Sequence, residues 1–445
     1  PIRNGLAEML QLSENQVRVI APFIGGGFGP KIMMFYQEEV LIPWAAMKIG
    51  RPIKWIEDRS ENFFATTQER SQIHTAEIAM DKSGLILGVW DKFLHDAGAY
   101  APYGLTVPIN SQCTLLGPYH IPNYYSEFDA VFTNFPIVTP YRGAGRQHGV
   151  FVMERLLDIA ARKMGIDRAE IRRRNFIEPD QFPYNNEIIY QDFAPLIYDS
   201  GNYDPSMKKA LDMIDYEKFT KETQPALQSE GRYVGLGIVA YVEGTGIGPY
   251  EGARVQVQAS GKVTAVTGVG TQGQGHFTSF AQIVADQLGV DVSDVDIVTG
   301  DTDQFYWGAG TFASRGAVVA GNAFNEAARD VRAKALKMAV DALEAEEEAV
   351  EEALEAAGYG DDAYFGSEEW ENSFSGPTSE MGGSIGGLCG VCKGLGYKEV
   401  YICRVCNTIS AEKAWHSMLD CVNHLNTKLN RICCEHGKNR WRLDG

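Results

Sequence analysis

Cysteine divides the 445-residue chain into two parts of different composition. Of its eight cysteines, only Cys113 lies in the first 388 residues, and the other seven lie in 389–445. A long body with one isolated thiol indicates a reducing compartment, where a later cysteine cluster is more often metal-binding than disulfide-bonded. We therefore expect a cytoplasmic protein in which a large body and a cysteine-rich tail fold as separate domains.

The formal net charge of −18 at pH 7 limits the partners of the body. Nucleic acids and anionic membranes carry charge of the same sign, so nucleic acid is a disfavoured partner and a small-molecule substrate fits better. No run approaches the roughly 20 apolar residues that cross a bilayer, so no membrane span is expected. The chain opens at Pro1 without a methionine, which predicts that it begins inside a longer parent.

A second break in composition is the acidic segment that follows the body. No Lys or Arg occurs from Met338 to Cys392, whereas Asp and Glu are frequent there. Apolar residues recur at helical spacing in its first half, which predicts one helix over 326–357 with a solvated acidic face. Gly358 would end this helix, and the Gly-, Ser- and acid-rich stretch behind it is typical of a linker.

The body mixes strand-like and helix-like segments. Alternating apolar residues predict strands at 17–24, 73–80, 85–94, 233–242, 253–259 and 263–269. Helical spacing predicts helices at 37–49, 149–165, 168–175, 207–219 and 277–288. This order, with a hairpin, favours an α+β fold over a doubly wound parallel sheet. With a polar stretch near residue 230 as a boundary, the expected domains are 1–230, 231–345, the acidic helix and linker 346–387, and the tail 388–445.

Three glycine loops follow strand-like runs, at 25–29, 141–146 and 270–276. Such loops let backbone N–H groups approach a ligand closely, and a helix start behind them adds partial positive charge, so phosphate or an oxyanion is a suitable guest. None matches G-x-G-x-x-G opening a helix or G-K-S/T, which disfavours nicotinamide nucleotides and ATP. Each loop alone is also explained as a tight turn that needs positive φ.

Five motifs occur in order along the body. They are Ala-Pro-Phe-Ile-Gly-Gly-Gly-Phe-Gly at 21–29, Pro-Tyr-Arg-Gly-Ala-Gly-Arg at 140–146, Tyr-Val-Glu-Gly-Thr-Gly at 241–246, Gly-Gln-Gly-His at 273–276, and Gly-Thr-Phe-Ala-Ser-Arg at 310–315 with Gly-Asn-Ala at 321–323. Together they resemble the large subunit of the molybdenum hydroxylases, the family of xanthine dehydrogenase, aldehyde oxidase and aerobic carbon monoxide dehydrogenase. The resemblance covers about residues 1–345. It implies two molybdenum-pterin-binding domains of mixed sheets and helices.

The resemblance also implies an activity and a set of partners. In this family a carbon atom of the substrate is hydroxylated with oxygen from water, and the electrons leave through iron–sulfur clusters and FAD. We therefore expect an FAD-binding subunit and a [2Fe–2S] subunit as partners, in a dimer of heterotrimers. The cofactor expected is the cytosine dinucleotide form of molybdenum-pterin, as in bacterial relatives.

Site residues are carried over from the motifs they match. Phe28 would lie near the substrate, and Arg142 would be the substrate-side arginine that stabilises negative charge or holds a carbonyl. The alternative for Arg142 is a buried ion pair. Carbon monoxide dehydrogenases carry a copper-binding Cys where this chain has Gly143, so an N-heterocycle or an aldehyde is the expected substrate. The residues that would contact the cofactor are Gly27, Phe28, Gly29, Arg142, Gly273, Gln274, Gly275, Ala313, Ser314 and Arg315.

Two features of the chain depart from the family or stay ambiguous. The family's catalytic base is a glutamate in a Gly-x-Gly-Glu motif, and this motif does not occur here; Glu243 belongs to a different segment. His276 either contacts the cofactor or packs at the start of a helix. One alternative to an enzyme subunit is therefore an incomplete cofactor scaffold joined to a zinc-binding module that recruits a partner. Another is that body and tail derive from unrelated reading frames.

The tail has the spacing of a zinc ribbon. Two Cys-x2-Cys knuckles separated by ten residues can complete a four-thiolate tetrahedron, and the intervening residues alternate as a hairpin requires. The expected zinc ligands are Cys389, Cys392, Cys403 and Cys406. A second zinc could use Cys421 and His424 with Cys433, Cys434 and His436, although Cys421 also fits the packed face of a helix.

Overall fold

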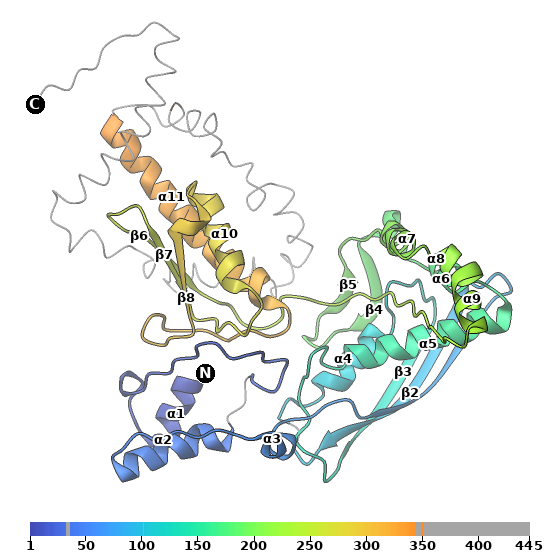
Figure 1. Ribbon diagram of the computed structural model, residues 1–445, viewed down its shortest axis with the longest axis horizontal. Coiled ribbons are helices and arrows are strands. Elements are labelled where there is room, and N and C mark those ends of the chain that lie inside the picture. Colours follow the sequence, from blue (N-terminus) through green and yellow to red (C-terminus); the bar gives the residue numbers. More distant parts are fainter. Residues whose placement is uncertain (33–35, 101, 344–348, 350–445) are drawn as a thin grey trace, which may run out of the picture. The chain divides into compact units, whose positions relative to one another are not determined.

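The computed structural model describes residues 1–32, 36–100, 102–343 and 349 (Figure 1). The predicted linker and zinc ribbon, with Cys389, Cys392, Cys403 and Cys406, lie outside the described residues. The chain forms two compact units. Among the described residues, unit 1 comprises those in 1–27, in 32–54 and from 245 onward, and unit 2 comprises those in 28–31 and 55–244. The units therefore divide the body differently from the sequential domains predicted, because the N-terminal segment belongs with residues that follow unit 2.

Unit 1 is built on a three-stranded sheet in the order β6-β7-β8. Its strands are β6 (Ala253–Val257), β7 (Val263–Thr267) and β8 (Val295–Thr299). β6 pairs antiparallel with β7, whereas β7 pairs parallel with β8. The parallel pairing needs a crossover, which helix α10 (His276–Leu288) and the short turn η4 (Val292–Asp294) supply.

The core of unit 1 lies between this sheet and two helices, α10 and α11 (Asn322–Leu343), as Figure 1 shows. Phe280 and Val284, four residues apart on α10, are both fully buried. Phe324 of α11 is also fully buried, and its ring centroid lies 5.0 Å from that of Phe280. The π-helix η5 (Gly316–Gly321) leads into α11. Residues 326–343 of the predicted 326–357 helix thus lie in α11, and the rest of it, apart from residue 349, lies outside the described residues.

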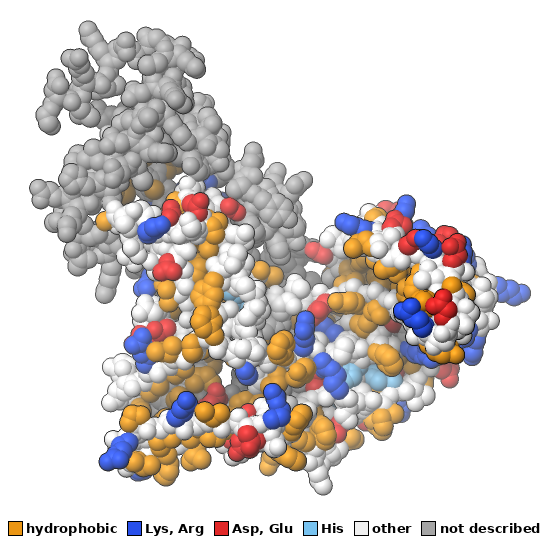
Figure 2. All heavy atoms as spheres, viewed as in Figure 1, with side chains coloured by type: hydrophobic (Ala, Val, Ile, Leu, Met, Phe, Trp, Pro, Cys, Tyr) orange, Lys and Arg blue, Asp and Glu red, His pale blue; other side chains and the backbone are white. Residues whose placement is uncertain are grey.

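The N-terminal part of unit 1 contributes the helices α1 (Ile2–Leu10), η1 (Glu14–Gln16) and α2 (Gln37–Ile49). The strand predicted at 17–24 is reduced to an isolated bridge between Ile20 and Asp301. Ala21 N–H donates to Gly300 O at 2.7 Å beside it. Helix α2 is confirmed at the predicted bounds, yet it buries no side chain, and Figure 2 shows hydrophobic side chains exposed over this part of unit 1.

Unit 2 is built on a second three-stranded sheet in the order β1-β2-β3. The predicted hairpin is confirmed by the antiparallel pair β1 (Gln72–Met80) and β2 (Ile86–Gly98). The sequence pattern missed β3 (Tyr124–Phe132), which lies parallel to β2 and is reached through α4 (Thr106–Thr114). Parallel strands of this kind have no short connection that would reveal them in the sequence.

Helix α5 (Arg146–Met164) packs its buried face on this sheet, and α6 (Arg168–Arg173) follows it. Both helices were predicted. Fully buried Arg172 on α6 pairs with Glu154 on α5 at 2.7 Å, and Tyr119 donates to the same carboxylate at 2.5 Å. Removing one partner would leave a buried charge uncompensated, so this ion pair fixes the two helices together.

The rest of unit 2 is a small hairpin and a group of short helices. The elements are α3 (Arg59–Ala65), η2 (Pro179–Gln181), β4 (Tyr184–Ile189), β5 (Pro195–Tyr198), α7 (Tyr203–Met213), α8 (Tyr216–Lys218), η3 (Phe219–Thr223) and α9 (Gln224–Ser229). The strand predicted at 233–242 is wrong: the segment pairs with no strand, and its alternation reflects packing of residues such as Ile238 into the core. No helix among the described residues is long and apolar enough to span a bilayer.

Candidate functional site

The loop 270–275 of unit 1 lies between β7 and helix α10. Gly273 and Gly275 have positive φ values of 120° and 80°, and a Cβ on either would meet no atom within 4 Å. Gln274 folds back on the loop, where its Oε1 accepts from Gln272 N–H at 2.8 Å. Gly275 is the N-cap of α10 and offers no side-chain cap to the first amides of the helix. Open space and uncapped amides suit an anionic ligand.

The first glycine loop meets the third within unit 1. A Cβ on Gly27 would overlap the side-chain amide of Gln272, so a larger residue at position 27 would require this amide to move. Phe23 also reaches the start of α10, with its ring centroid 6.2 Å from that of Phe277. Two loops almost 250 residues apart in the sequence therefore contact each other.

The loop 309–315 carries unusual backbone conformations. Ala313 and Ser314 have φ values of 48° and 52°, in the left-handed region that L residues avoid. Gly310 has φ 114°, and a Cβ there would meet nothing within 4 Å. Such conformations cost roughly 1–3 kcal/mol each and persist only where surrounding contacts impose them. Strain at two adjacent predicted cofactor residues is a typical feature of a ligand-binding loop.

The resemblance implies that Arg315 contacts the phosphate of the cofactor. In the structure, its partners are residues of the chain itself. Its side chain is fully buried and pairs with the fully buried Glu251. It also donates to the carbonyls of Gly310, at 2.8 Å, and Pro249, while its guanidinium lies 5.0 Å from the centre of the Phe312 ring. The structure thus uses Arg315 to hold the loop.

Glu251 is a residue that the sequence pattern did not single out. One carboxylate oxygen accepts from the backbone N–H groups of Ala309 and Gly310, at 3.0 and 3.1 Å, and pairs with Arg315. Burial raises the pKa of Glu251, although Arg315 and these amides act in the opposite direction. A lone acid in a Pro-Tyr-Glu-Gly segment gives no signal that its partner lies 64 residues later.

His276 opens helix α10 as a buried residue. Its ring stacks on Phe280 with centroids 4.7 Å apart, and burial lowers its pKa. Its Nδ1 atom has no hydrogen-bond partner among the described residues. A Cβ on Gly316 would lie 2.6 Å from Nε2, so the imidazole packs tightly against η5. Packing at the helix start is therefore present, and contact with a cofactor stays a prediction.

In unit 2 the structure brings Phe28 and Arg142 together. Arg142 N–H donates to the carbonyl of Phe28 at 2.7 Å, and the Arg142 guanidinium lies 5.8 Å from the centre of the Phe28 ring. Both side chains are exposed. Arg142 forms no ion pair with any described residue, which removes the alternative of a buried ion pair. Phe28 itself has φ 55°, a costly conformation for an aromatic residue.

The loop that carries Arg142 is supported from several sides, by residues that the sequence analysis did not identify. Arg70 donates to Arg142 O at 2.6 Å, Asn110 donates to Ala144 O at 2.9 Å, and Ser111 donates to Gly145 O at 2.8 Å. Each bond holds a backbone carbonyl, so the loop keeps its shape while the Arg142 side chain is left accessible.

Histidines near this loop have no metal-binding arrangement. Burial lowers the pKa of His95 to about 4 and that of His148 to about 4, so both are neutral at physiological pH. His74 contacts the buried Asp91 at 3.0 Å. Among the described residues there is no group of three or more His, Cys, Asp or Glu side chains that could hold a metal ion.

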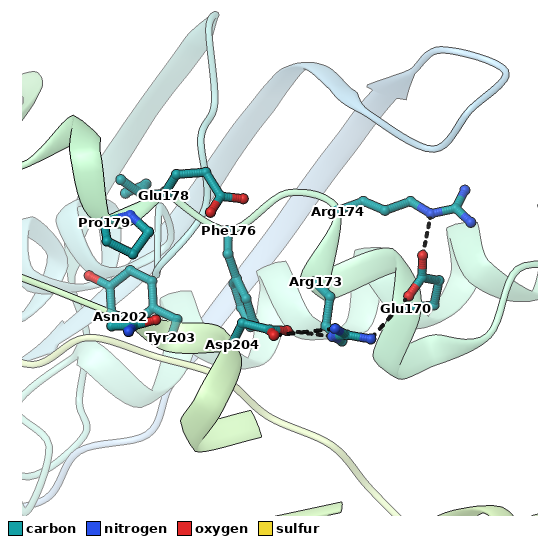
Figure 3. Close-up of a pocket in the computed structure, with 10 residues that line it drawn as sticks. Glu170, Arg173, Arg174, Phe176, Glu178, Pro179, Asn202, Tyr203 and Asp204 are labelled. Atoms are coloured by element: carbon teal, nitrogen blue, oxygen red, sulfur yellow. Dashed lines mark hydrogen bonds and ion pairs between the residues drawn. The ribbon is translucent and has the colours of Figure 1, made fainter. Parts of the chain in front are cut away.

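A polar cavity of about 280 Å³ in unit 2 contains none of the predicted site residues (Figure 3). Its lining includes Glu170, Arg173 and Asp204, and Figure 3 shows the arginine between the two acids. Arg173 pairs with both carboxylates. Because these charges satisfy one another, the cavity offers little to bind a charged ligand.

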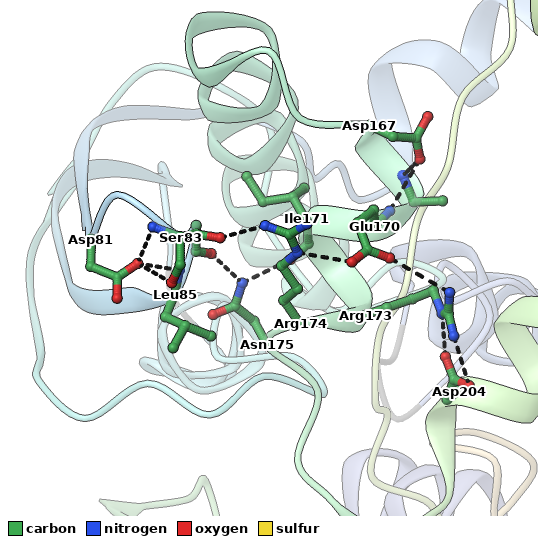
Figure 4. Close-up of polar contacts among 12 residues, drawn as sticks. Asp81, Ser83, Leu85, Asp167, Glu170, Ile171, Arg173, Arg174, Asn175 and Asp204 are labelled. Carbon is green, nitrogen blue, oxygen red and sulfur yellow. Dashed lines mark hydrogen bonds and ion pairs between the residues drawn. The ribbon is translucent and has the colours of Figure 1, made fainter.

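The same cluster instead anchors the β1–β2 hairpin, as Figure 4 shows. Arg174 pairs with Glu170 at 2.8 Å and donates to Ser83 O in the hairpin turn at 2.5 Å. Asn175 donates to Gly84 O at 2.8 Å and accepts from Ile86 N–H at 2.8 Å. The cavity is therefore a by-product of a structural network.

Comparison with known proteins agrees with the loop geometry. A family model described as a molybdopterin cofactor-binding domain matches residues 1–176, and a second model of the same description matches residues 209–373. The gamma subunit of the 6-hydroxypseudooxynicotine dehydrogenase complex of Paenarthrobacter nicotinovorans is 37% identical over 354 residues, which are 78% of this chain and 44% of that protein. The large chain of carbon monoxide dehydrogenase of Hydrogenophaga pseudoflava is 34% identical, with the same coverage.

Among solved structures, quinoline 2-oxidoreductase from Pseudomonas putida 86 matches with a TM-score of 0.72 and 35% identity, over 78% of this chain and 45% of that one. The fold and its glycine loops define a molybdopterin cofactor-binding protein. The chain belongs to the molybdenum hydroxylase family and corresponds to a segment of its large subunit. It spans about 44% of the length of the curated relatives named above.

Proposed function

We propose that this chain is the cofactor-binding portion of a molybdenum-dependent oxidoreductase that hydroxylates a carbon atom of an N-heterocycle or an aldehyde. The observation that carries the proposal is the conformation of the glycine loops in the two units. Positive φ values recur at the positions that the family motifs occupy, in non-glycine residues as well as glycines, and the space beside Gly273, Gly275 and Gly310 in unit 1 is open.

The loops of unit 1 fit a pterin cofactor. The space above Gly273 and Gly275 is open, and the uncapped start of α10 suits a phosphate. The Gln274 amide can both donate and accept, as a pterin ring requires. Gly27, Ala313 and Ser314 would complete the contacts, whereas Arg315 would act by holding its loop. When bound, the cofactor supplies two-electron oxidation and transfer of oxygen from water.

In unit 2, Arg142 and Phe28 would bind and orient the substrate. The exposed guanidinium can stabilise negative charge that develops on the substrate, and the Phe28 ring can pack against an aromatic heterocycle. Gly29, beside the backbone of Pro140 and Tyr141, lets the two loops approach each other closely. The hydrogen bond from Arg142 N–H to the Phe28 carbonyl keeps the two residues in a fixed position relative to each other.

The shape of the Arg142 loop supports a heterocycle or aldehyde rather than carbon monoxide. Gly143 has φ 102°, and a Cβ there would overlap the Gln147 side chain. A cysteine at this position, as in carbon monoxide dehydrogenases, would therefore be strained and crowded. The solved relative named as quinoline 2-oxidoreductase acts on a heterocycle by its name, which supports the same substrate class.

The expected partners follow from the family. Electrons would pass to a [2Fe–2S] subunit and an FAD-binding subunit, in a cytoplasmic dimer of heterotrimers. The pterin would be the cytosine dinucleotide form. The catalytic glutamate would come from sequence beyond the segment that this chain represents.

Elemental analysis of the purified chain tests the proposal. Molybdenum and released pterin nucleotide near one per polypeptide are the expected results for this chain, and dye reduction by quinoline or an aldehyde is expected in a complex that also supplies the catalytic glutamate. Molybdenum without turnover in that complex would refute the enzyme assignment and leave a cofactor scaffold. Zinc without molybdenum or pterin would refute cofactor binding itself.

A further inference from the structure

The structure assigns to Glu251 the role of a positioning residue that, through Arg315, sets the backbone of the cofactor loop 309–314. This inference rests on the proposed function, because the loop is taken to contact the cofactor. It concerns a residue outside the family motifs that define the site.

Glu251 acts on both ends of the loop. Its Oε1 atom accepts from Ala309 and Gly310 N–H at the start and pairs with Arg315 at the end. Arg315 in turn donates to Gly310 O at 2.8 Å. The carboxylate and guanidinium therefore join the first and last residues of the loop by side-chain bonds that are fully shielded from solvent.

The residues between these ends carry the strain. Ala313 and Ser314 are both left-handed, and Ala313 O accepts one further bond, from Gly246 N–H at 3.2 Å. Phe312 is held between the Arg315 guanidinium and the backbone of Gly248, where a Cβ would lie 3.2 Å from its ring. A loop closed at both ends in this way cannot relax to ordinary φ values without breaking the ion pair.

A buried ion pair that served stability alone would be replaceable by uncharged groups of similar size. A double substitution therefore separates the two roles. If the pair only stabilises the fold, the double variant should regain both melting temperature and cofactor content, whereas if the pair positions the loop, it should regain the melting temperature alone. Glu251→Gln keeps an acceptor for the two amides, and Arg315→Met keeps an apolar stem without the charge. Each single variant leaves a buried charge unpaired and should unfold at lower temperature, whereas E251Q/R315M should recover most of the wild-type melting temperature.

The experiment measures molybdenum and pterin per polypeptide in the full 445-residue protein and in each variant. We expect less molybdenum and pterin per polypeptide in E251Q/R315M than in wild type, because residues that orient a metal site indirectly contribute about ten- to hundredfold in affinity. The matched control is E154Q/R172M, which replaces the buried Arg172–Glu154 pair of unit 2 and should leave cofactor content unchanged. Wild-type cofactor content in E251Q/R315M would overturn the inference.

A second readout is independent of the cofactor. Hydrogen exchange of the Ala309 and Gly310 amides should be about tenfold faster in E251Q/R315M than in wild type, because they lose a charged acceptor. Unchanged exchange would also overturn the inference. Failure of the proposed function is a separate result: wild-type protein without molybdenum refutes cofactor binding, and the exchange rates then still decide whether Glu251 positions the loop.

Discussion

Arg70 donates a hydrogen bond of 2.6 Å to the backbone carbonyl of Arg142, 72 residues further along the chain. Its guanidinium also lies 5.2 Å from the centre of the Tyr141 ring and pairs with the buried Glu69. Arg70 itself has φ 88°, a conformation that costs an L residue about 1–3 kcal/mol. Arg70 thus contacts the loop 141–146 and is itself in a strained conformation. We infer that Arg70 fixes the position of the Arg142 backbone, from which the Arg142 side chain extends.

Arg70→Met should therefore impair turnover more than folding. Loss of the bond to Arg142 O lets the loop shift, and a misplaced orienting group costs about tenfold to a hundredfold in rate. Cofactor content should stay at the wild-type value. The measurement is the rate of dye reduction with the heterocycle or aldehyde as the electron-donating substrate. Arg155→Met, at an exposed position of α5, is the control, and equal rates in the two variants would contradict the prediction.

Gly143→Ala should destabilise unit 2 more than Gly165→Ala does. Both positions have positive φ, 102° and 67°, so alanine is strained at each. A Cβ at Gly165 meets nothing within 4 Å, whereas one at Gly143 overlaps Gln147. We expect a loss of about 1 kcal/mol for Gly165→Ala and a further 1–3 kcal/mol for Gly143→Ala in urea unfolding. Equal losses would show that Gln147 moves aside freely.

Stability should fall between pH 6.5 and pH 4 through His95. Burial lowers its pKa from 6.5 to about 4 in the folded chain. Above pH 6.5 neither state is protonated there, so His95 does not change the free energy of unfolding. Between the two pKa values the unfolded chain takes up a proton that the folded chain does not, so stability is lost as pH falls and the loss levels off below pH 4.

His95→Gln should remove up to about 3 kcal/mol of this pH-dependent loss, at 1.36 kcal/mol per pKa unit. The measurement compares urea unfolding of wild type and variant at pH 7 and pH 4.5. His120→Gln, at an exposed position of the same unit, is the control for the histidine-to-glutamine substitution itself. A pH slope in His95→Gln equal to that of wild type would refute the assignment.

Gly316→Ala should lower the melting temperature, and His276→Ala should compensate it. Gly316 does not have positive φ, so the cost arises from its Cβ, which would lie 2.6 Å from Nε2 of the buried His276 ring. Overpacking of this kind costs about 1–3 kcal/mol. In a double-mutant cycle followed by thermal unfolding, we expect Gly316→Ala to cost less in the His276→Ala background than alone. Strict additivity of the two substitutions would be the contrary result.

Elements with strong local patterns were predictable from the sequence. The β1–β2 hairpin, α2, α5 and α10 have clear periodicity and stop signals such as Gly50 and Gly289, and the structure contains them. The strand predicted at 233–242 shows the limit of this reasoning. Apolar alternation records which side chains face a core, and Ile238 faces one without any strand beside it.

Contacts between residues far apart in the sequence could not be predicted. The pairing of Glu251 with Arg315 and the bond from Arg70 to Arg142 join residues whose local segments carry no periodic signal. Parallel strand β3 was missed because its partner β2 is separated from it by helix α4. The motifs lie in loops of the structure, but they do not reveal which distant residues hold those loops in shape.

In the sequence, unit 2 separates the N-terminal segment of unit 1 from the rest of unit 1, and this order has a consequence for synthesis of the protein. Val19 accepts a bond from Thr302 N–H and donates to the hydroxyl of the same residue, 283 positions later. At translation rates of about 5–20 residues per second, the early segment waits roughly 15–60 s for its partner to leave the ribosome. During that time residues 55–244 emerge as one uninterrupted stretch. We expect nascent chains to complete unit 2 first, while α1 and α2 stay available to chaperones.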